Sequence, residues 1–186
     1  MEEAAKELGK PISKLNAIIC HLGGGWSTTA IKAGKPVDTS MGWTPLEGLV
    51  MMTRCGDLDP GIVVELFKKE GENLYNLLNF ESGIKGLTGV NDFQELLKRV
   101  SLGNREAKLA FDLAIYRLVK YIGAYFAVLE GKIDAIVFTG AIGAGNPMTR
   151  LEVMRKLKFL GKIPVIVVKA NEELMIAREV GKLLGL

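Results

Sequence analysis

The chain has 186 residues, of which 48% are hydrophobic, 24% charged and 7% aromatic, enough for one good-sized domain or two small ones. Its 24 basic and 21 acidic residues form no concentrated basic run, which argues against a nucleic-acid partner. No stretch is apolar over the length of a membrane-spanning helix, and the first residues do not resemble a signal peptide. With only Cys20 and Cys55, a disulfide framework is excluded, and we expect a soluble cytoplasmic protein with reduced thiols and no membrane partner.

The first forty residues predict a short helix followed by strands. Residues 1–9 are typical of a helix that ends at a glycine. The apolar run 16–22 and the β-branched run 26–32 predict two strands joined by the glycines at 23–25, and 35–38 predicts a third strand.

Residues 38–60 form a long segment rich in Gly, Pro, Thr and Asp, without helical or strand periodicity. A long irregular segment inside a compact domain is usually functional or disordered, and its apolar side chains favour an ordered site loop. Arg54 lies in it, followed by Asp57 and Asp59, an arrangement that suits anion binding. The alternative is that one of the two aspartates merely caps the helix that begins at residue 60.

The rest of the chain mixes helices and strands. We predict helices from residue 60 and at 73–80, 92–100, 104–129, 150–157 and 171–186, and strands at 133–139 and 164–169. A hairpin unit followed by strand–helix alternation predicts an α/β domain with a mixed sheet flanked by helices. No linker divides the chain, so we expect residues 1–186 to form one domain.

Three glycine-rich segments, at 23–25, 86–89 and 140–145, are expected to be turns that each follow or flank a strand. Such turns let backbone N–H groups approach a phosphate, although hairpins and helix caps need glycine for their own geometry. Neither the Walker A nor the Rossmann spacing is present, so the pattern favours a nucleotide only weakly.

His21 is the single histidine, and a lone histidine at a strand end is more often structural than catalytic. It has no recognisable triad partners, and metal-ligand spacing is absent. A Mg²⁺ ion held mostly by phosphate and water would need one or two carboxylates, which Glu172 or Glu173 could supply. The alternative is that these acids favour the amino end of the last helix.

Taken together, these segments resemble the acetate kinase family. HLGGG at 21–25 stands where the family has its HLGNG phosphate loop, and 37–60 (VDTSMGWTPLEGLVMMTRCGDLDP) is nearly the whole family signature. FTGAIG at 138–143 and NEELMIA at 171–177 follow in the family's order. The resemblance implies the actin, Hsp70 and sugar-kinase (ribonuclease H-like) fold. It makes this chain the C-terminal, nucleotide-binding and dimerisation lobe of a two-lobed enzyme.

The resemblance also implies a reaction in which ATP and acetate give ADP and acetyl phosphate with Mg²⁺. It gives Arg54 and His21 catalytic roles, with Arg54 contacting both the carboxylate and the transferred phosphoryl group. Pro45 would line the acyl pocket, and Glu172 would hold the metal. The implied nucleotide contacts are His21, Leu22, Gly23, Gly24, Gly25, Asp92, Phe93, Gln94, Ala141, Ile142, Gly143, Ala144 and Gly145.

Departures from the family gather in the nucleotide segments. Asn is replaced by Gly24, Arg by Gln94, and the Glu–Asn pair by Ala144 and Gly145, and Trp26 and Ala170 also differ. Losing several charge-assisted hydrogen bonds, each worth roughly 1.5–3 kcal/mol, would weaken nucleotide binding by orders of magnitude. Two hypotheses follow. The chain is a carboxylate-kinase lobe that is inactive without an N-terminal lobe, which a separate chain could supply, or it is a degenerate module for nucleotide binding or homodimerisation.

Overall fold

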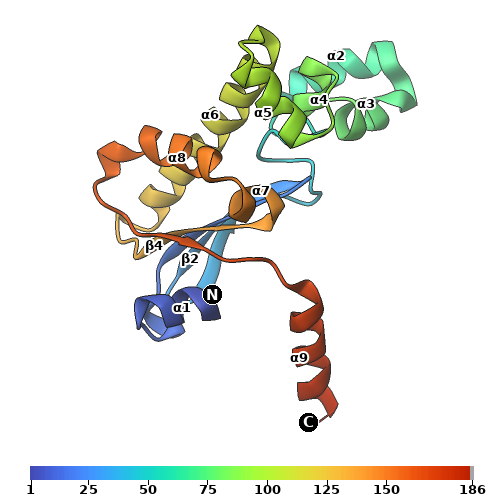
Figure 1. Cartoon of the computed structure of the whole chain (residues 1–186). Coiled ribbons are helices and arrows are strands. Elements are labelled where there is room, and N and C mark those ends of the chain that lie inside the picture. Colours follow the sequence, from blue (N-terminus) through green and yellow to red (C-terminus); the bar gives the residue numbers. More distant parts are fainter. Residues whose placement is uncertain (185–186) are drawn as a thin grey trace.

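The computed structural model describes residues 1–184, except for the side chains of residues 172, 174 and 179. A five-stranded sheet of order β3-β2-β1-β4-β5 lies at its centre (Figure 1). The strands are β1 (Ala17–Leu22), β2 (Trp26–Lys32), β3 (Lys35–Thr39), β4 (Ala135–Thr139) and β5 (Val165–Val167). β1, β4 and β5 run parallel, while β2 is antiparallel to β1 and β3, which confirms the predicted mixed sheet.

Helices cover both faces of the sheet. They are α1 (Glu2–Leu8), α2 (Pro60–Glu70), α3 (Leu74–Phe80), α4 (Gly83–Thr88), α5 (Phe93–Ser101), α6 (Arg105–Val128), α7 (Gly140–Gly145), α8 (Pro147–Lys156) and α9 (Glu172–Leu184). Alternation along β1 separates two cores, because Ile18, Cys20 and Leu22 pack with α6, whereas Ala17 packs with α1 on the opposite face. The long helix α6 contacts β1, β2, α4, α5 and α8, so it organises the larger core.

The glycine-rich segments at 86–89 and 140–145 correct the sequence prediction. Instead of turns, they contribute to the short helices α4 and α7. Tertiary contacts override the low helix propensity of glycine, because the amides of Ile84 and Lys85 donate to the carbonyls of Met51 and Met52. α8 also begins earlier than expected, because Asn146 caps it by accepting from the Thr149 amide at 2.8 Å.

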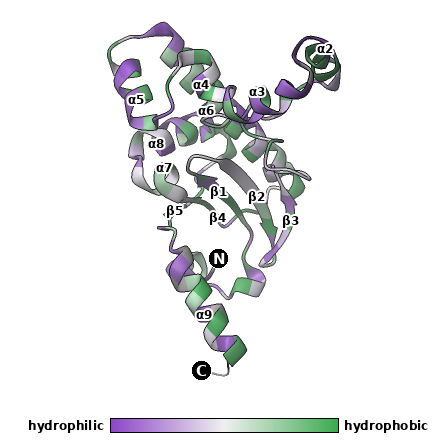
Figure 2. Cartoon of the chain, turned by 90° about the vertical axis from the view of Figure 1, so that its right-hand side faces the viewer, coloured by the Kyte–Doolittle hydropathy of each residue, from purple (hydrophilic) through white to green (hydrophobic). Residues whose placement is uncertain are grey.

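The last helix, α9, extends away from the sheet (Figure 1). Figure 2 shows both hydrophobic and hydrophilic residues along it, and Met175, Ile176 and Val180 are 46%, 65% and 47% exposed. The final two residues of the predicted helix, 185–186, lie outside the described residues. Within residues 1–184, none of the helices combines the length and the hydropathy needed to span a membrane.

Candidate functional site

The carboxyl ends of the parallel strands β1, β4 and β5 meet at one edge of the sheet, which is where ligands bind in open α/β sheets. His21 lies near the end of β1, α7 follows β4 directly, and Lys169 comes just after β5. Together they surround a cleft of about 460 Å³, lined by His21, Gly140, Ala141, Ala144, Gly145, Lys169 and Ala170. The structure therefore unites His21 with the 140–145 segment as expected, and it adds Lys169.

Small residues of α7 form one wall of this cleft. A Cβ atom at Gly140, whose φ is 81°, would lie only 2.5 Å from the Leu22 carbonyl oxygen. Only glycine therefore allows α7 to start against β1. Ile142 and Gly143 face the protein interior, whereas a Cβ at Gly145 would meet no atom within 4 Å. One side of α7 is thus structural, and the other side leaves open space.

The turn at 23–25 is closed by its own hydrogen bonds. The Gly23 amide donates to the Gly25 carbonyl at 3.0 Å, and the Trp26 indole Nε1 donates to the Gly23 carbonyl at 2.9 Å. Trp26 is fully buried and packs edge-on against Phe93, with ring centroids 5.9 Å apart. Trp26, one of the departures from the family, therefore has a structural role, because its side chain fixes the turn. A Cβ at Gly24 would meet no atom within 4 Å, so this position faces open space.

Arg54 lies beside the same turn. Its Nη1 atom would be 2.9 Å from a Cβ at Gly25, and it donates to the Met51 sulfur at 3.5 Å. In the described part of the chain Arg54 forms no ion pair, so its positive charge is not neutralised by a carboxylate. Its backbone is fixed, because the Arg54 carbonyl accepts from the Met51 amide at 3.2 Å. A Cβ at Gly83, the first residue of α4, would lie 2.3 Å from the Met51 carbonyl oxygen.

Asp57 anchors the loop that carries Arg54. Its carboxylate accepts from the Gly48 amide (2.8 Å), from Arg117 Nη1 (2.8 Å) and from the Tyr121 hydroxyl (2.9 Å). Burial, assisted by this hydrogen bond and by the carboxylate charge, raises the pKa of Tyr121 to about 12. The loop is therefore tied to the middle of α6.

Asp59 has the helix-capping role that the sequence suggested as the alternative to anion binding. Its carboxylate accepts from the Gly61 amide at 2.8 Å and caps α2, as predicted for one of the two aspartates. The anchoring role of Asp57 was missed, because Arg117 and Tyr121 lie 60 and 64 residues further along the chain. No local pattern could have revealed it.

The remaining predicted site residues do not line the cleft. Asp92 caps α5 by accepting from the Glu95 amide at 2.8 Å, Phe93 is buried, and Gln94 is exposed. The contact between Phe93 and Trp26 nonetheless places the start of α5 next to β2. Pro45 is exposed in the 38–60 loop. The next residue, Leu46, borders an apolar groove of about 380 Å³ together with Phe67, Leu74, Tyr75 and Leu78.

A metal site is not formed by the described side chains alone. Among the residues that the structure describes, no three His, Cys, Asp or Glu side chains come together to hold a metal ion. A Mg²⁺ ion that arrives with a nucleotide needs only one or two protein carboxylates. The predicted ligand, the Glu172 side chain, lies outside what is described.

Known proteins resemble this chain over nearly all of its length. The acetokinase family model matches residues 1–163. The acetate kinase of Carboxydothermus hydrogenoformans is 43% identical over 202 residues, which cover 95% of this chain and 50% of that protein. The acetate kinase of Campylobacter jejuni subsp. doylei is 47% identical over 208 residues, with 98% and 52% covered. Both alignments are longer than this chain, so the relatives contain residues without a counterpart here.

Solved structures agree with the sequence comparison. The crystal structure of Porphyromonas gingivalis acetate kinase matches with a TM-score of 0.93 and 37% identity, covering 98% of this chain and 52% of that chain. A propionate kinase from Francisella tularensis matches with a TM-score of 0.90 and 38% identity, covering 96% and 51%. These matches confirm the expected fold. The chain spans about half the length of the curated relatives that it matches.

Proposed function

Because the chain belongs to the acetokinase family, we propose that it is the C-terminal half of a short-chain carboxylate kinase. The reaction would transfer the γ-phosphoryl group of ATP to acetate and give ADP and acetyl phosphate. The observation that carries this proposal is the position of Arg54. An unneutralised guanidinium group lies beside the Gly23–Gly25 turn and is held there by a loop anchored through Asp57.

In this reaction a carboxylate oxygen forms a bond to the γ-phosphorus while the bond to the bridging oxygen of ADP breaks. Catalysis of such a step consists mainly of positioning and charge stabilisation. Arg54 would hold the carboxylate and neutralise charge on the transferred group. His21 and the backbone amides of the 23–25 turn would face the phosphates, with the nucleoside against Ala141, Ala144 and Gly145. Mg²⁺ would supply further positive charge, and Glu172 is its proposed ligand.

We further propose that this half is inactive alone. Phosphoryl transfer to acetate requires exclusion of water, which in two-lobed kinases comes from closure of the lobes. Pro45 and the fully exposed Trp43 lie on the solvent side of the loop, so an acyl pocket at Pro45 needs walls from another polypeptide segment. An N-terminal lobe, in the same or in a separate chain, would provide them.

A reconstitution assay tests this function. The purified chain is incubated with ATP, Mg²⁺ and acetate, with and without the purified N-terminal half of the Carboxydothermus hydrogenoformans acetate kinase, and acetyl phosphate is trapped as the hydroxamate. We expect product only in the mixture and none with Arg54→Ala. That N-terminal half with its own C-terminal half is the positive control. Turnover by the isolated chain at roughly 1–100 s⁻¹, the usual range for kinases, would contradict the need for a second half.

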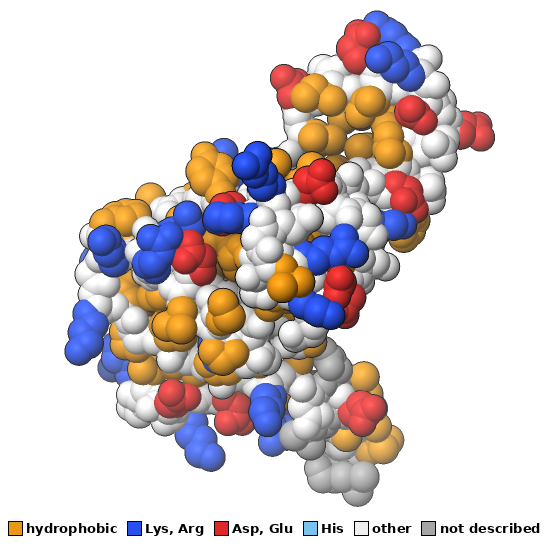
Figure 3. All heavy atoms as spheres, turned by 45° about the horizontal axis from the view of Figure 1, so that its top comes forward, with side chains coloured by type: hydrophobic (Ala, Val, Ile, Leu, Met, Phe, Trp, Pro, Cys, Tyr) orange, Lys and Arg blue, Asp and Glu red, His pale blue; other side chains and the backbone are white. Residues whose placement is uncertain are grey.

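A second candidate is a module for homodimerisation or for nucleotide binding without catalysis. Large apolar side chains are exposed on α2 (Ile62, Val64 and Phe67), on α3 (Tyr75 and Phe80) and on α6 (Leu109 and Tyr116). Figure 3 shows hydrophobic side chains gathered on the projection formed by α2 and α3. Such apolar groups often mark protein interfaces. Light scattering at micromolar concentration should give twice the 20.2 kDa chain mass if this surface forms a dimer, and a monomer would count against it.

We propose a cytoplasmic location. Both cysteines, Cys20 and Cys55, are free thiols, which is the usual state in a reducing compartment. Fractionation of cells that contain the protein would test this assignment.

A further inference from the structure

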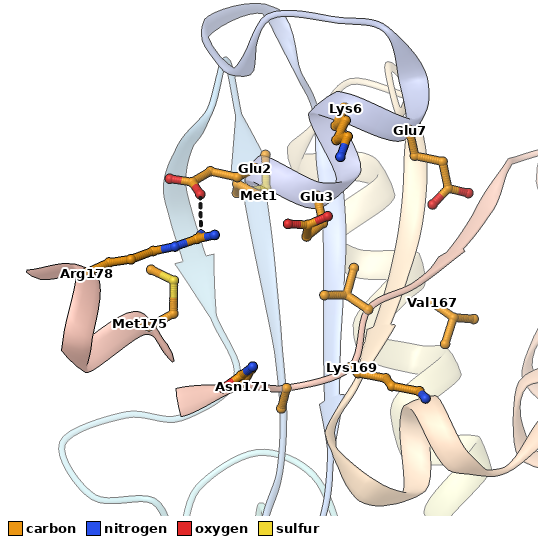
Figure 4. A pocket seen from close by; sticks show the side chains of 12 residues that line it. Met1, Glu2, Glu3, Lys6, Glu7, Val167, Lys169, Asn171, Met175 and Arg178 are labelled. Atoms are coloured by element: carbon orange, nitrogen blue, oxygen red, sulfur yellow. Dashed lines mark hydrogen bonds and ion pairs between the residues drawn. The ribbon is translucent and has the colours of Figure 1, made fainter. Parts of the chain in front are cut away.

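Lys169 lies on the connection between β5 and α9, where two hollows of the surface meet. It lines the 460 Å³ cleft beside His21, and it also borders a larger pocket of about 910 Å³ between α1 and α9. Figure 4 shows its side chain extending away from the Glu2–Arg178 ion pair and from Glu3. The ammonium group is therefore free to serve the cleft.

The lining of this cleft contains, among the described side chains, a basic one and no acidic one. It consists of Lys169 and His21 together with glycine and alanine residues. Lys169 is exposed, and within the described residues it takes part in no ion pair. The neighbouring 910 Å³ pocket contains Glu2, Glu3 and Glu7, but none of them forms an ion pair with Lys169. Its ammonium group lies in a hollow at the carboxyl ends of three parallel strands, where it attracts an anion.

We propose that Lys169 binds the phosphates of a nucleoside diphosphate or triphosphate in this cleft. This role would replace the positive charge that the family has where this chain carries Gln94. Gln94 is exposed at the start of α5 and does not line the cleft, whereas Lys169 does. A lysine ammonium on a flexible stem is a suitable point charge for phosphate. The inference rests on the proposed nucleotide-binding function and adds a residue to it.

Calorimetric titration of the whole chain with ADP and, separately, with adenosine tests the role. We compare the wild type with Lys169→Ala, with Lys169→Arg and with the control Lys162→Ala, an exposed lysine that does not line the cleft. Lys169→Ala should weaken ADP binding about tenfold or more, as expected for one charge-assisted hydrogen bond, and leave adenosine binding unchanged. Lys169→Arg should keep most of the ADP affinity, and Lys162→Ala should keep all of it. The salt dependence of ADP binding should also be shallower in Lys169→Ala.

Three results would overturn the inference. The first is equal ADP affinity for the wild type and Lys169→Ala. The second is a loss of adenosine affinity in Lys169→Ala as large as its loss of ADP affinity. The third is no ADP binding by the wild type at millimolar concentration. The last result would leave the kinase proposal standing, because that proposal is decided by acetyl phosphate formation in the reconstituted mixture. Lys169 is exposed, so unchanged urea midpoints should show that the variants remain folded.

Discussion

The loop that carries Arg54 and the cleft beside His21 lie at the same end of the sheet but are built in opposite ways. The loop is fixed by tertiary contacts, with Asp57 bonded to Gly48, Arg117 and Tyr121. The cleft is bordered by glycine and alanine, and the positions of Gly24 and Gly145 face open space. One region is determined by its own packing, and the other leaves room for a ligand.

This contrast explains where the chain departs from its family. In the loop, a change at Asp57 would break a hydrogen-bond network, and a Cβ atom at Gly48 or Gly56 would clash with a backbone carbonyl group. At Gly24 or Gly145, loss of the family's side chain disturbs no contact within the protein. The departures at Gly24 and Gly145 therefore leave the packing of the fold unchanged, so loop and cleft should respond differently to substitution.

Gly83→Ala should have the largest effect. Its φ is 61°, and the new Cβ would lie 2.3 Å from the Met51 carbonyl oxygen and 2.7 Å from that of Arg54. Left-handed strain together with a backbone clash should lower the free energy of unfolding by about 3 kcal/mol or more. The control, Gly24→Ala, has free space and no left-handed φ, so we expect a change within about 0.5 kcal/mol. Urea unfolding measures both, and equal effects would contradict the contrast between loop and cleft.

Asp57→Ala should come next. It removes the partner of Arg117, and because the two side chains are 32% and 21% exposed, the loss should be below that of a fully buried pair, at about 2 kcal/mol. Asp59→Ala is the matched control, since it loses only the α2 cap, which is worth about 1 kcal/mol. The two are compared by urea unfolding. A smaller effect at Asp57 than at Asp59 would show that the anchor to α6 contributes little.

Restoring family residues at Gly24, in the 23–25 turn, and at Gly145, in the cleft, should improve ADP binding without changing stability. The double variant Gly24→Asn/Gly145→Asn places amide side chains in free space, where two new hydrogen bonds of about 0.5–1.5 kcal/mol each would raise ADP affinity roughly tenfold. Gly123→Asn, also in free space but on α6, is the control and should leave ADP affinity unchanged. Calorimetry gives the affinities. An unchanged affinity in the double variant would mean that the nucleotide does not approach these positions.

Local pattern was sufficient for part of this architecture. The continuous apolar run at 16–22 and the β-branched run at 26–32 predicted β1 and β2, and the apolar stripe at 104–129 predicted α6. The helices α4 and α7 could not be predicted, because contacts from distant carbonyls and a close approach to β1 determine them. In the site, Arg54 was a candidate from its own sequence surroundings, and His21 was assigned through the resemblance. Lys169 was not predicted as a site residue, because the sequence pattern made it the last residue of the predicted strand at 164–169.

The smallest expected effect is the pH dependence of stability that comes from the two free thiols, Cys20 on β1 and Cys55 in the 38–60 loop. Complete burial raises the pKa of Cys20, on β1 beneath α7, to about 12 from its usual 9, and burial also raises the pKa of the partly exposed Cys55. A raised thiol pKa in the folded state means that the unfolded state releases its proton first. The contribution of Cys20 to stability is therefore complete below pH 9 and is lost as the pH rises from 9 toward 12.

Between pH 8.5 and 9.5 the wild type should lose under about 1 kcal/mol of unfolding free energy through Cys20. Urea unfolding of Cys20→Ala should show a flatter dependence over this range, before Tyr121, with its pKa of about 12, begins to contribute above pH 10. Cys55→Ala is the control and should flatten the curve less, because its thiol is only partly buried. A thiol reagent should label Cys55 in the folded protein but reach Cys20 only on unfolding. Rapid labelling of both would mean that the strand ends beneath the cleft open readily, and the contrast would then lie in dynamics as well as in packing.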